Sequence, residues 1–135
     1  MQYKLTTSSK RLLADTLTPV NIYLKLRDVF AGSILLESSD YHGHENSLSF
    51  ICCEPIASFQ VRGNTVDMRF PDGKTRKEAV TKTGQVTQYL EDFRQSFEVS
   101  APESKYVNCG LFGYIAYDAV RFFEDVSITA KESII

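Results

Sequence analysis

The chain has 135 residues, a formal net charge of −2 and 43% hydrophobic residues. This size and hydrophobic content predict one domain, 1–135, with a substantial core. Its 17 acidic and 15 basic residues are scattered, so the sequence lacks the cluster of positive charge that a nucleic-acid backbone requires. No apolar run approaches the roughly 20 residues of a membrane span. We therefore expect neither a nucleic-acid partner nor a membrane partner.

The cysteines and the amino terminus indicate the compartment. Cys52 and Cys53 are adjacent in an apolar run, and Cys109 makes the number odd. This pattern suits buried free thiols better than a disulfide framework. The first 13 residues are polar and lack a signal-peptide core. We therefore expect a cytoplasmic protein.

The first third of the chain predicts a strand, a helix and a second strand. Apolar and polar residues alternate over 3–7, which is a weak strand signal. Thr18 and Pro19 are suited to the N-cap and first position of a helix. Apolar residues then recur at helical spacing until Gly32, a plausible stop. The apolar run 33–38 follows directly and predicts a buried strand.

The central part of the chain predicts antiparallel strands joined by turns. A polar stretch, 39–46, separates the run 33–38 from the next apolar run. Gly63 and Asn64 form a pair suited to a tight hairpin. Lysines in the last of these strands suit a sheet edge. The predicted strands are 48–53, 57–61, 65–70 and 74–80.

The last third predicts a second helix and a final strand-to-helix unit. Apolar residues three and four apart predict an amphipathic helix over 84–98, followed by a linker over 99–105. The densest apolar run begins at residue 108, and its glycines and continuous hydrophobicity predict a strand buried on both faces. From Asp118 the spacing becomes helical, with Asp118 as the cap. Neighbouring strands with tight turns favour an α+β fold, with antiparallel sheets and flanking helices, over a parallel, doubly wound sheet.

One group of residues could be imagined to bind a metal ion. An H-x-H pair in a loop lacks the paired spacings of structural zinc sites, and adjacent cysteines on a strand point to opposite faces. A solvated polar loop is therefore the favoured interpretation. The sequence also lacks a nucleophile elbow and a phosphate-binding glycine loop. We predict no catalytic and no metal-binding residue in this chain. The metal candidates considered are Asp40, His42, His44, Glu45, Cys52 and Cys53.

The end of the predicted strand 33–38 offers a better candidate site. Leu36, Glu37 and Ser38 place an apolar wall, a carboxylate and a hydroxyl next to one another. A free amino acid with a large side chain requires this mixture of groups. Many strands end in Glu-Ser for solubility alone, so a ligand site and a solvated strand end both stay open from the residues themselves.

Four segments taken together resemble the amino-terminal region of anthranilate synthase component I. Their order and separation carry the resemblance, which runs from about residue 17 to 124. Members of that family are considerably longer than this chain. The resemblance therefore implies an amino-terminal piece of the large subunit, in agreement with a chain that ends on two apolar residues without a terminating signal. The four segments are 17–26, 35–38, 49–51 and 110–124.

The resemblance implies a role in an enzyme that converts chorismate to anthranilate and pyruvate in tryptophan biosynthesis. In the family, the large subunit uses Mg²⁺ and ammonia that a glutamine amidotransferase subunit delivers. The active site lies in the carboxyl-terminal part of the large subunit. No acid, base, chorismate or magnesium position of the family falls on residues 1–135, so we expect this piece to be inactive alone.

The resemblance also implies a regulatory site and a fold. The amino-terminal region of the family contributes to the site where tryptophan binds as a feedback inhibitor. The motif match assigns that role to Leu36, Glu37 and Ser38. Members often have a basic or aromatic residue shortly before the serine of the following strand, whereas this chain has Leu48 before Ser49. Leu48 is expected to supply an apolar wall but no polar contact. The implied fold is an α/β/β/α sandwich of two orthogonal antiparallel sheets with helices outside.

Two alternative functions stay open. Aminodeoxychorismate synthase component I, a homologue on the folate pathway, can carry a similar amino-terminal domain and makes a para product. A free-standing amino-acid-binding or subunit-docking module, without chemistry of its own, is an alternative of a different class. A plain structural domain would require the motif match to be accidental.

Overall fold

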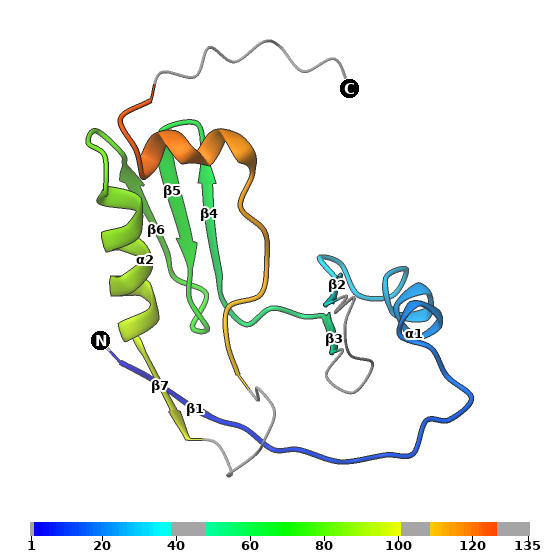
Figure 1. Ribbon diagram of the computed structural model, residues 1–135. Coiled ribbons are helices and arrows are strands. Elements are labelled where there is room, and N and C mark those ends of the chain that lie inside the picture. Colours follow the sequence, from blue (N-terminus) through cyan, green and yellow to red (C-terminus); the bar gives the residue numbers. More distant parts are fainter. Residues whose placement is uncertain (1, 39–47, 101–108, 127–135) are drawn as a thin grey trace. The chain divides into compact units, whose positions relative to one another are not determined.

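The chain folds into two compact units of mixed α and β structure, as a computed structural model shows (Figure 1). The model describes residues 2–38, 48–100 and 109–126. The larger unit combines Met1–Ser8 with Ile56–Ile135, and the smaller unit is Ser9–Pro55. The predicted α+β class is confirmed, whereas the single domain and the orthogonal sandwich stay predictions. None of the helices in these ranges has the length and apolar character that crossing a membrane requires.

A three-stranded antiparallel sheet forms the centre of the larger unit. Its strands, β4 (Ser58–Arg62), β5 (Thr65–Arg69) and β6 (Thr75–Ala79), lie in chain order. Arg62 pairs with Thr65, so Gly63 and Asn64 alone form the turn. Gly63 has a φ of 56°, which a residue without a Cβ adopts at little cost. The predicted hairpin is confirmed, and β6 is an edge strand as predicted.

Helix α2 (Gln85–Gln95) packs against this sheet, and its carboxyl-terminal end differs from the prediction. The helix stops before Phe97, where strand β7 (Phe97–Ser100) begins and pairs in parallel with β1 (Tyr3–Thr6). The Phe97 ring lies 5.7 Å from that of Tyr3. The predicted helix over 84–98 and linker over 99–105 are therefore wrong at this junction, because pairing with the distant strand β1 overrides the local helical spacing.

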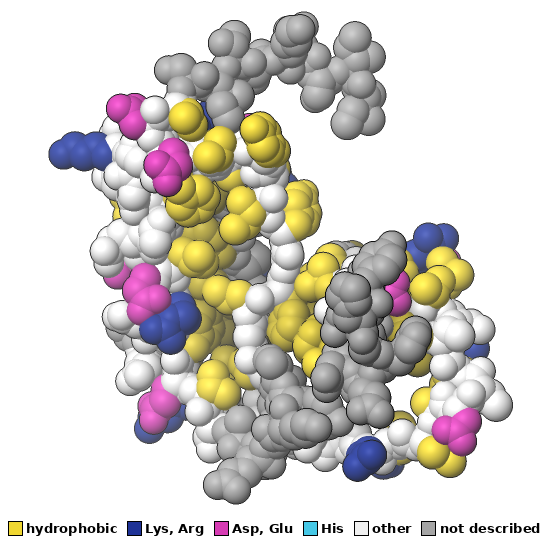
Figure 2. All heavy atoms as spheres, in the orientation of Figure 1, with side chains coloured by type: hydrophobic (Ala, Val, Ile, Leu, Met, Phe, Trp, Pro, Cys, Tyr) yellow, Lys and Arg dark blue, Asp and Glu magenta, His cyan; other side chains and the backbone are white. Residues whose placement is uncertain are grey.

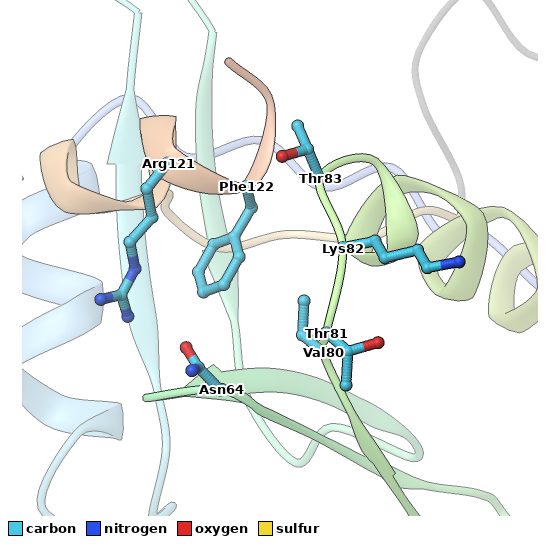
Figure 3. A pocket seen from close by; sticks show the side chains of 7 residues that line it. All are labelled: Asn64, Val80, Thr81, Lys82, Thr83, Arg121 and Phe122. Carbon is cyan, nitrogen blue, oxygen red and sulfur yellow. The ribbon is translucent and has the colours of Figure 1, made fainter. Parts of the chain in front are cut away.

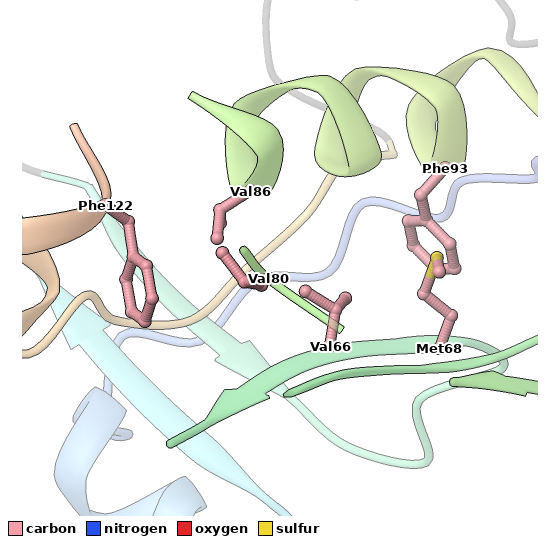
Figure 4. Close-up of a cluster of buried hydrophobic side chains, with 6 residues drawn as sticks. All are labelled: Val66, Met68, Val80, Val86, Phe93 and Phe122. Carbon is pink, nitrogen blue, oxygen red and sulfur yellow. The ribbon is translucent and has the colours of Figure 1, made fainter. Parts of the chain in front are cut away.

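The core of the larger unit lies between the sheet and α2, and residue spacing explains its composition (Figure 4). Val66 and Met68 are two apart on β5 and point to one face of the sheet. Val86 and Phe93 are seven apart, two helical turns, on one side of α2. The six buried hydrophobic residues are Val66, Met68, Val80, Val86, Phe93 and Phe122.

The smaller unit contains helix α1 (Pro19–Leu26) and a hairpin of β2 (Ile34–Glu37) and β3 (Ser49–Cys52), against which the helix packs. Thr18 is the N-cap, and its Oγ1 accepts a hydrogen bond of 3.2 Å from the backbone N–H of Asn21. The predicted helix start is confirmed. The helix ends at Leu26, before the predicted stop at Gly32, because residues 27–32 form turns.

The segment with the strongest apolar signal contradicts the prediction of a buried strand. Residues 110–116 form no strand with any described part of the chain, and Tyr114 is 90% exposed. A Cβ at Gly113 would meet no atom within 4 Å, so no close backbone approach requires this glycine. Figure 2 shows hydrophobic side chains at the surface. The exposed large hydrophobic residues of this segment are Leu111, Phe112, Tyr114 and Ile115.

The helix that follows this segment is a 3₁₀ helix, η2 (Tyr117–Phe122). The predicted helix is confirmed, but its capping residue is wrong. Ala116 occupies the N-cap position, no side chain caps the helix, and Asp118 lies inside the first turn. An acidic residue there still interacts favourably with the helix dipole. Phe122, at the other end of η2, is buried in the core.

The exposed face of α2 carries a network of charged side chains that determines one pKa. Arg94 donates to both carboxylate oxygens of Glu91, at 2.8 and 2.6 Å, and Gln95 donates to Oε1 at 2.8 Å. The Arg94 hydrogen bonds are the main cause that lowers the pKa of Glu91 to about 2. A depressed pKa of a carboxyl group means that its contribution to stability is present above about pH 4.5 and is lost as the pH falls towards 2.

We expect a carboxyl titration followed by NMR to give Glu91 a pKa close to 2. Arg94→Gln removes the charge-assisted pair and should return the pKa of Glu91 towards the ordinary value of 4.5. Arg76→Gln removes the same charge from strand β6, where Arg76 pairs with Glu78, and should leave Glu91 unchanged. An ordinary pKa for Glu91 in the unsubstituted protein would contradict this pairing.

Candidate functional site

The hairpin of β2 and β3 brings the four predicted site residues to one end. In the register, Leu36 pairs with Phe50 and Glu37 pairs with Ser49. The backbone N–H of Ser38 donates to the carbonyl oxygen of Leu48 at 3.0 Å, which extends the ladder by one further step. Leu36, Glu37, Ser38 and Leu48 therefore lie together where the hairpin meets its connection, although Leu48 is ten residues from Ser38.

The strand geometry separates these residues onto two faces of the hairpin. Successive side chains on a strand point to opposite faces, and directly paired residues share a face. Leu36 and Phe50, both half-buried, therefore share one face, and the same alternation assigns Ser38 and Leu48 to it. Glu37 lies on the other face. The four residues thus meet at the hairpin end without lining a single surface.

Among the described residues, Glu37 accepts a side-chain hydrogen bond from across the hairpin. Ser49 Oγ donates to Glu37 Oε1 at 3.4 Å, and both side chains are exposed. Within the same described ranges, no basic side chain forms an ion pair with Glu37. A carboxylate of this kind binds a cation such as an ammonium most strongly.

Sequence reasoning did not single out Ser49 and Phe50 as neighbours of Glu37 and Leu36. The reason is that the strand register depends on the connection between the two strands, and the sequence of that connection does not specify its conformation. Ser49 and Phe50 did belong to one of the segments that carry the family resemblance. The resemblance in that segment was therefore the sequence signal that involved Ser49 and Phe50, but it did not indicate with which residues they pair.

The imagined metal ligands do not form a site in the described structure. Asp40, His42, His44 and Glu45 lie outside the described residues. Within the described ranges, no group of three His, Cys, Asp or Glu residues is placed to hold a metal ion.

The cysteines confirm one prediction and correct another. All three are free thiols, as predicted, and partial burial raises the pKa of the Cys52 thiol. Cys53 and Cys109 are exposed, so the prediction that these thiols are buried is wrong for both. Each lies beyond the end of regular structure, Cys53 directly after β3 and Cys109 before the exposed apolar segment.

Comparison with known proteins gives relatives of a single name. Anthranilate synthase component 1 of Thermus thermophilus is 31% identical over 121 residues, which cover 85% of this chain and 23% of that protein. The Aquifex aeolicus protein of the same name is 30% identical over 116 residues, with the same coverage. That of Lactococcus lactis is 26% identical over 132 residues, covering 93% of this chain and 25% of its own length.

The extent of these matches limits what they show. The chain spans about a quarter of the length of the curated relatives it matches. No protein-family model matches the chain, and no solved structure matches it. The relatives nevertheless agree with the resemblance that the sequence motifs predict. This chain is similar to a region of the anthranilate synthase component 1 proteins, and the predicted family resemblance is confirmed.

Proposed function

We propose that this chain is the amino-terminal, regulatory part of the large subunit of an anthranilate synthase and contributes to its tryptophan feedback site. The observation that carries the proposal is its similarity to anthranilate synthase component 1 proteins over 82–93% of its length. The hairpin geometry supports it, because the four motif-assigned residues lie at one hairpin end. The complete enzyme converts chorismate to anthranilate and pyruvate in tryptophan biosynthesis.

The chemistry of the hairpin end suits an amino acid with a large apolar side chain. In this proposal the Glu37 carboxylate accepts the ammonium group, and the Ser38 hydroxyl donates to the ligand carboxylate. Leu36 and Leu48 supply apolar contact for the indole ring. Since Glu37 and Leu36 lie on opposite faces of the hairpin, tryptophan lies across its end rather than flat on one face.

The chemical steps belong to parts of the protein outside residues 1–135. The proposal assigns no catalytic residue and no Mg²⁺ ligand to this chain, and the chain alone is inactive. Chorismate and Mg²⁺ bind in the carboxyl-terminal part of the complete large subunit, and a glutamine amidotransferase subunit supplies ammonia. The assembly is a cytoplasmic enzyme whose activity tryptophan lowers from a distance, which is a coupling between two sites.

The experiment that tests this proposal uses the full natural polypeptide that contains this chain. Chorismate, Mg²⁺ and ammonium are supplied, and anthranilate fluorescence is followed at increasing L-tryptophan. We expect anthranilate formation that tryptophan suppresses. Ser38→Ala removes one hydrogen bond to a charged group, so the half-inhibiting tryptophan concentration should rise about tenfold. The rate without tryptophan should not change.

A matched control separates the site from a general effect of losing a serine hydroxyl. Ser8 is exposed and lies in the other unit, so Ser8→Ala should leave tryptophan inhibition unchanged. Chorismate consumed without anthranilate would favour aminodeoxychorismate synthase component I. An absence of turnover, with this chain as the whole natural product, would favour the amino-acid-binding or docking module. Tryptophan inhibition that Ser38→Ala leaves intact would contradict the assigned site.

A further inference from the structure

A cavity of about 200 Å³ lies within the larger unit (Figure 3). Three segments that are distant in the sequence form it: the turn between β4 and β5, the connection from β6 to α2, and the end of η2. Among the residues that the structure describes, two basic side chains and no acidic one line the cavity. The lining residues are Asn64, Val80, Thr81, Lys82, Thr83, Arg121 and Phe122.

Backbone hydrogen bonds hold the walls of this cavity in place. The N–H of Val80 donates to the carbonyl of Asn64 at 2.8 Å, and the N–H of Gly84 donates to the carbonyl of Phe122 at 2.9 Å. These two bonds join all three segments. The backbone N–H groups of Thr81 and Lys82 are already used, because both donate to Gln85 Oε1. These two backbone donors are therefore not free to bind a ligand.

Arg121 is the most unusual group at the cavity. Its Nη2 donates to the carbonyl of Gly63 at 3.2 Å, and its Cζ lies 4.8 Å from the centre of the Phe122 ring. Both contacts fix the guanidinium. Its Nε is hidden from solvent, without a hydrogen-bond partner, and no described carboxylate forms an ion pair with Arg121.

A partly buried guanidinium that forms no ion pair destabilises the fold unless a bound anion balances its charge. The group carries its charge at every physiological pH, and a partly buried charge without a counter-ion costs free energy. Its planar N–H groups match the oxygens of a carboxylate or phosphate. In Figure 3 the Asn64 amide lies on the same side of the Phe122 ring as the guanidinium, whereas Lys82 extends away and adds only positive potential.

We propose that this cavity binds a small oxyanion, a carboxylate or a phosphate group, through the guanidinium of Arg121 with the Asn64 amide beside it. The cavity volume of about 200 Å³ leaves room for such a group. The site shares no residue with the proposed tryptophan site, and its residues all belong to the larger unit.

Calorimetric titration of the full natural polypeptide tests this site at constant ionic strength. Inorganic phosphate and acetate are titrated in separate experiments, with chloride as the background anion. Comparison of the two titrations shows whether the site binds a phosphate or a carboxylate. We expect saturable binding of at least one. Arg121→Gln removes the charge and the fork of donors, and should weaken that binding by about tenfold or more. Arg121→Lys keeps the charge but loses the planar set of donors, so its affinity should lie between those of the unsubstituted protein and Arg121→Gln.

Arg11→Gln is the matched control, because it removes the same charge from an exposed position in the smaller unit; it should leave the affinity unchanged. The thermal midpoint of each variant shows whether it folds. If Arg121→Gln does not fold, Asn64→Ala, at an exposed turn, should still weaken binding several-fold. The same affinity in the Arg121 variants, or no saturable binding of either anion, would overturn the site. Neither result depends on whether tryptophan inhibits the enzyme.

Discussion

Replacing Phe93 with alanine is expected to lower the free energy of unfolding of the larger unit by about 3–5 kcal/mol. Phe93 is 1% exposed, and its ring packs against those of Phe59, Phe70 and Phe97 at centroid distances of 5.7, 5.3 and 5.1 Å. Truncation removes both the burial of a large ring and three aromatic contacts. Urea denaturation followed by circular dichroism measures the change.

A second substitution at residue 93 serves as the control for the destabilisation by Phe93→Ala. Phe93→Leu keeps most of the buried volume and should cost less than about half as much, since volume-conserving replacements in a core are tolerated best. A loss below about 1 kcal/mol for Phe93→Ala would contradict the packing that we describe. If Phe93→Ala abolished only the pairing of β7 with β1, the role of Phe93 would be limited to its contact with Phe97.

Phe122→Ala is expected to release η2 from the larger unit, at a cost of about 3–5 kcal/mol. Phe122 is 8% exposed and is the one buried hydrophobic residue of the described stretch 109–126. Without this ring, the segment keeps few apolar contacts with the core, and segments of that kind open locally. Hydrogen exchange of the η2 amides, against those of α2, measures the release.

Phe123→Ala provides the matched comparison, because it makes the same chemical change one residue further along. Phe123 is 44% exposed, so its truncation should cost less than about 1 kcal/mol and leave the exchange of η2 nearly unchanged. Equal effects of the two substitutions would show that η2 is not anchored by Phe122.

Much of the fold could be predicted where the signal is local. The Thr18 cap and the Gly63-Asn64 turn were predicted because a side-chain acceptor and a residue without a Cβ determine the backbone within a few residues. Strands β2 to β6 follow from short apolar or alternating runs between turn residues. These signals require no knowledge of distant contacts.

The errors occurred where distant contacts decide the structure. Phe97 fits the helical spacing of α2 equally well, yet it begins a strand because β1 lies beside it. The run 110–116 has the composition of a buried strand, but composition does not supply the neighbouring strands that burial requires. The apolar spacing after Leu26 likewise predicted more helix than forms.

The membership of the candidate site stays a prediction from the motif, whereas its geometry comes from the structure. The motif gave Leu36, Glu37 and Ser38 as consecutive residues, and the hairpin register brings Leu48 to them. The division between two faces follows from the alternation of a strand, once the strand is known. The pairing of Glu37 with Ser49 required the register. The cavity at Arg121 gave no sequence signal, since its residues come from three distant segments.

The parallel pairing of β1 with β7 sets an order of events during synthesis of the chain. Tyr3 pairs with Phe97, so strand β1 has no partner until more than ninety further residues of this chain have been made. All of the smaller unit, Ser9–Pro55, is made in that interval and depends mainly on contacts near in sequence. Closing so long a loop is slow. Strand β1 therefore joins the larger unit only after residue 100 has been made.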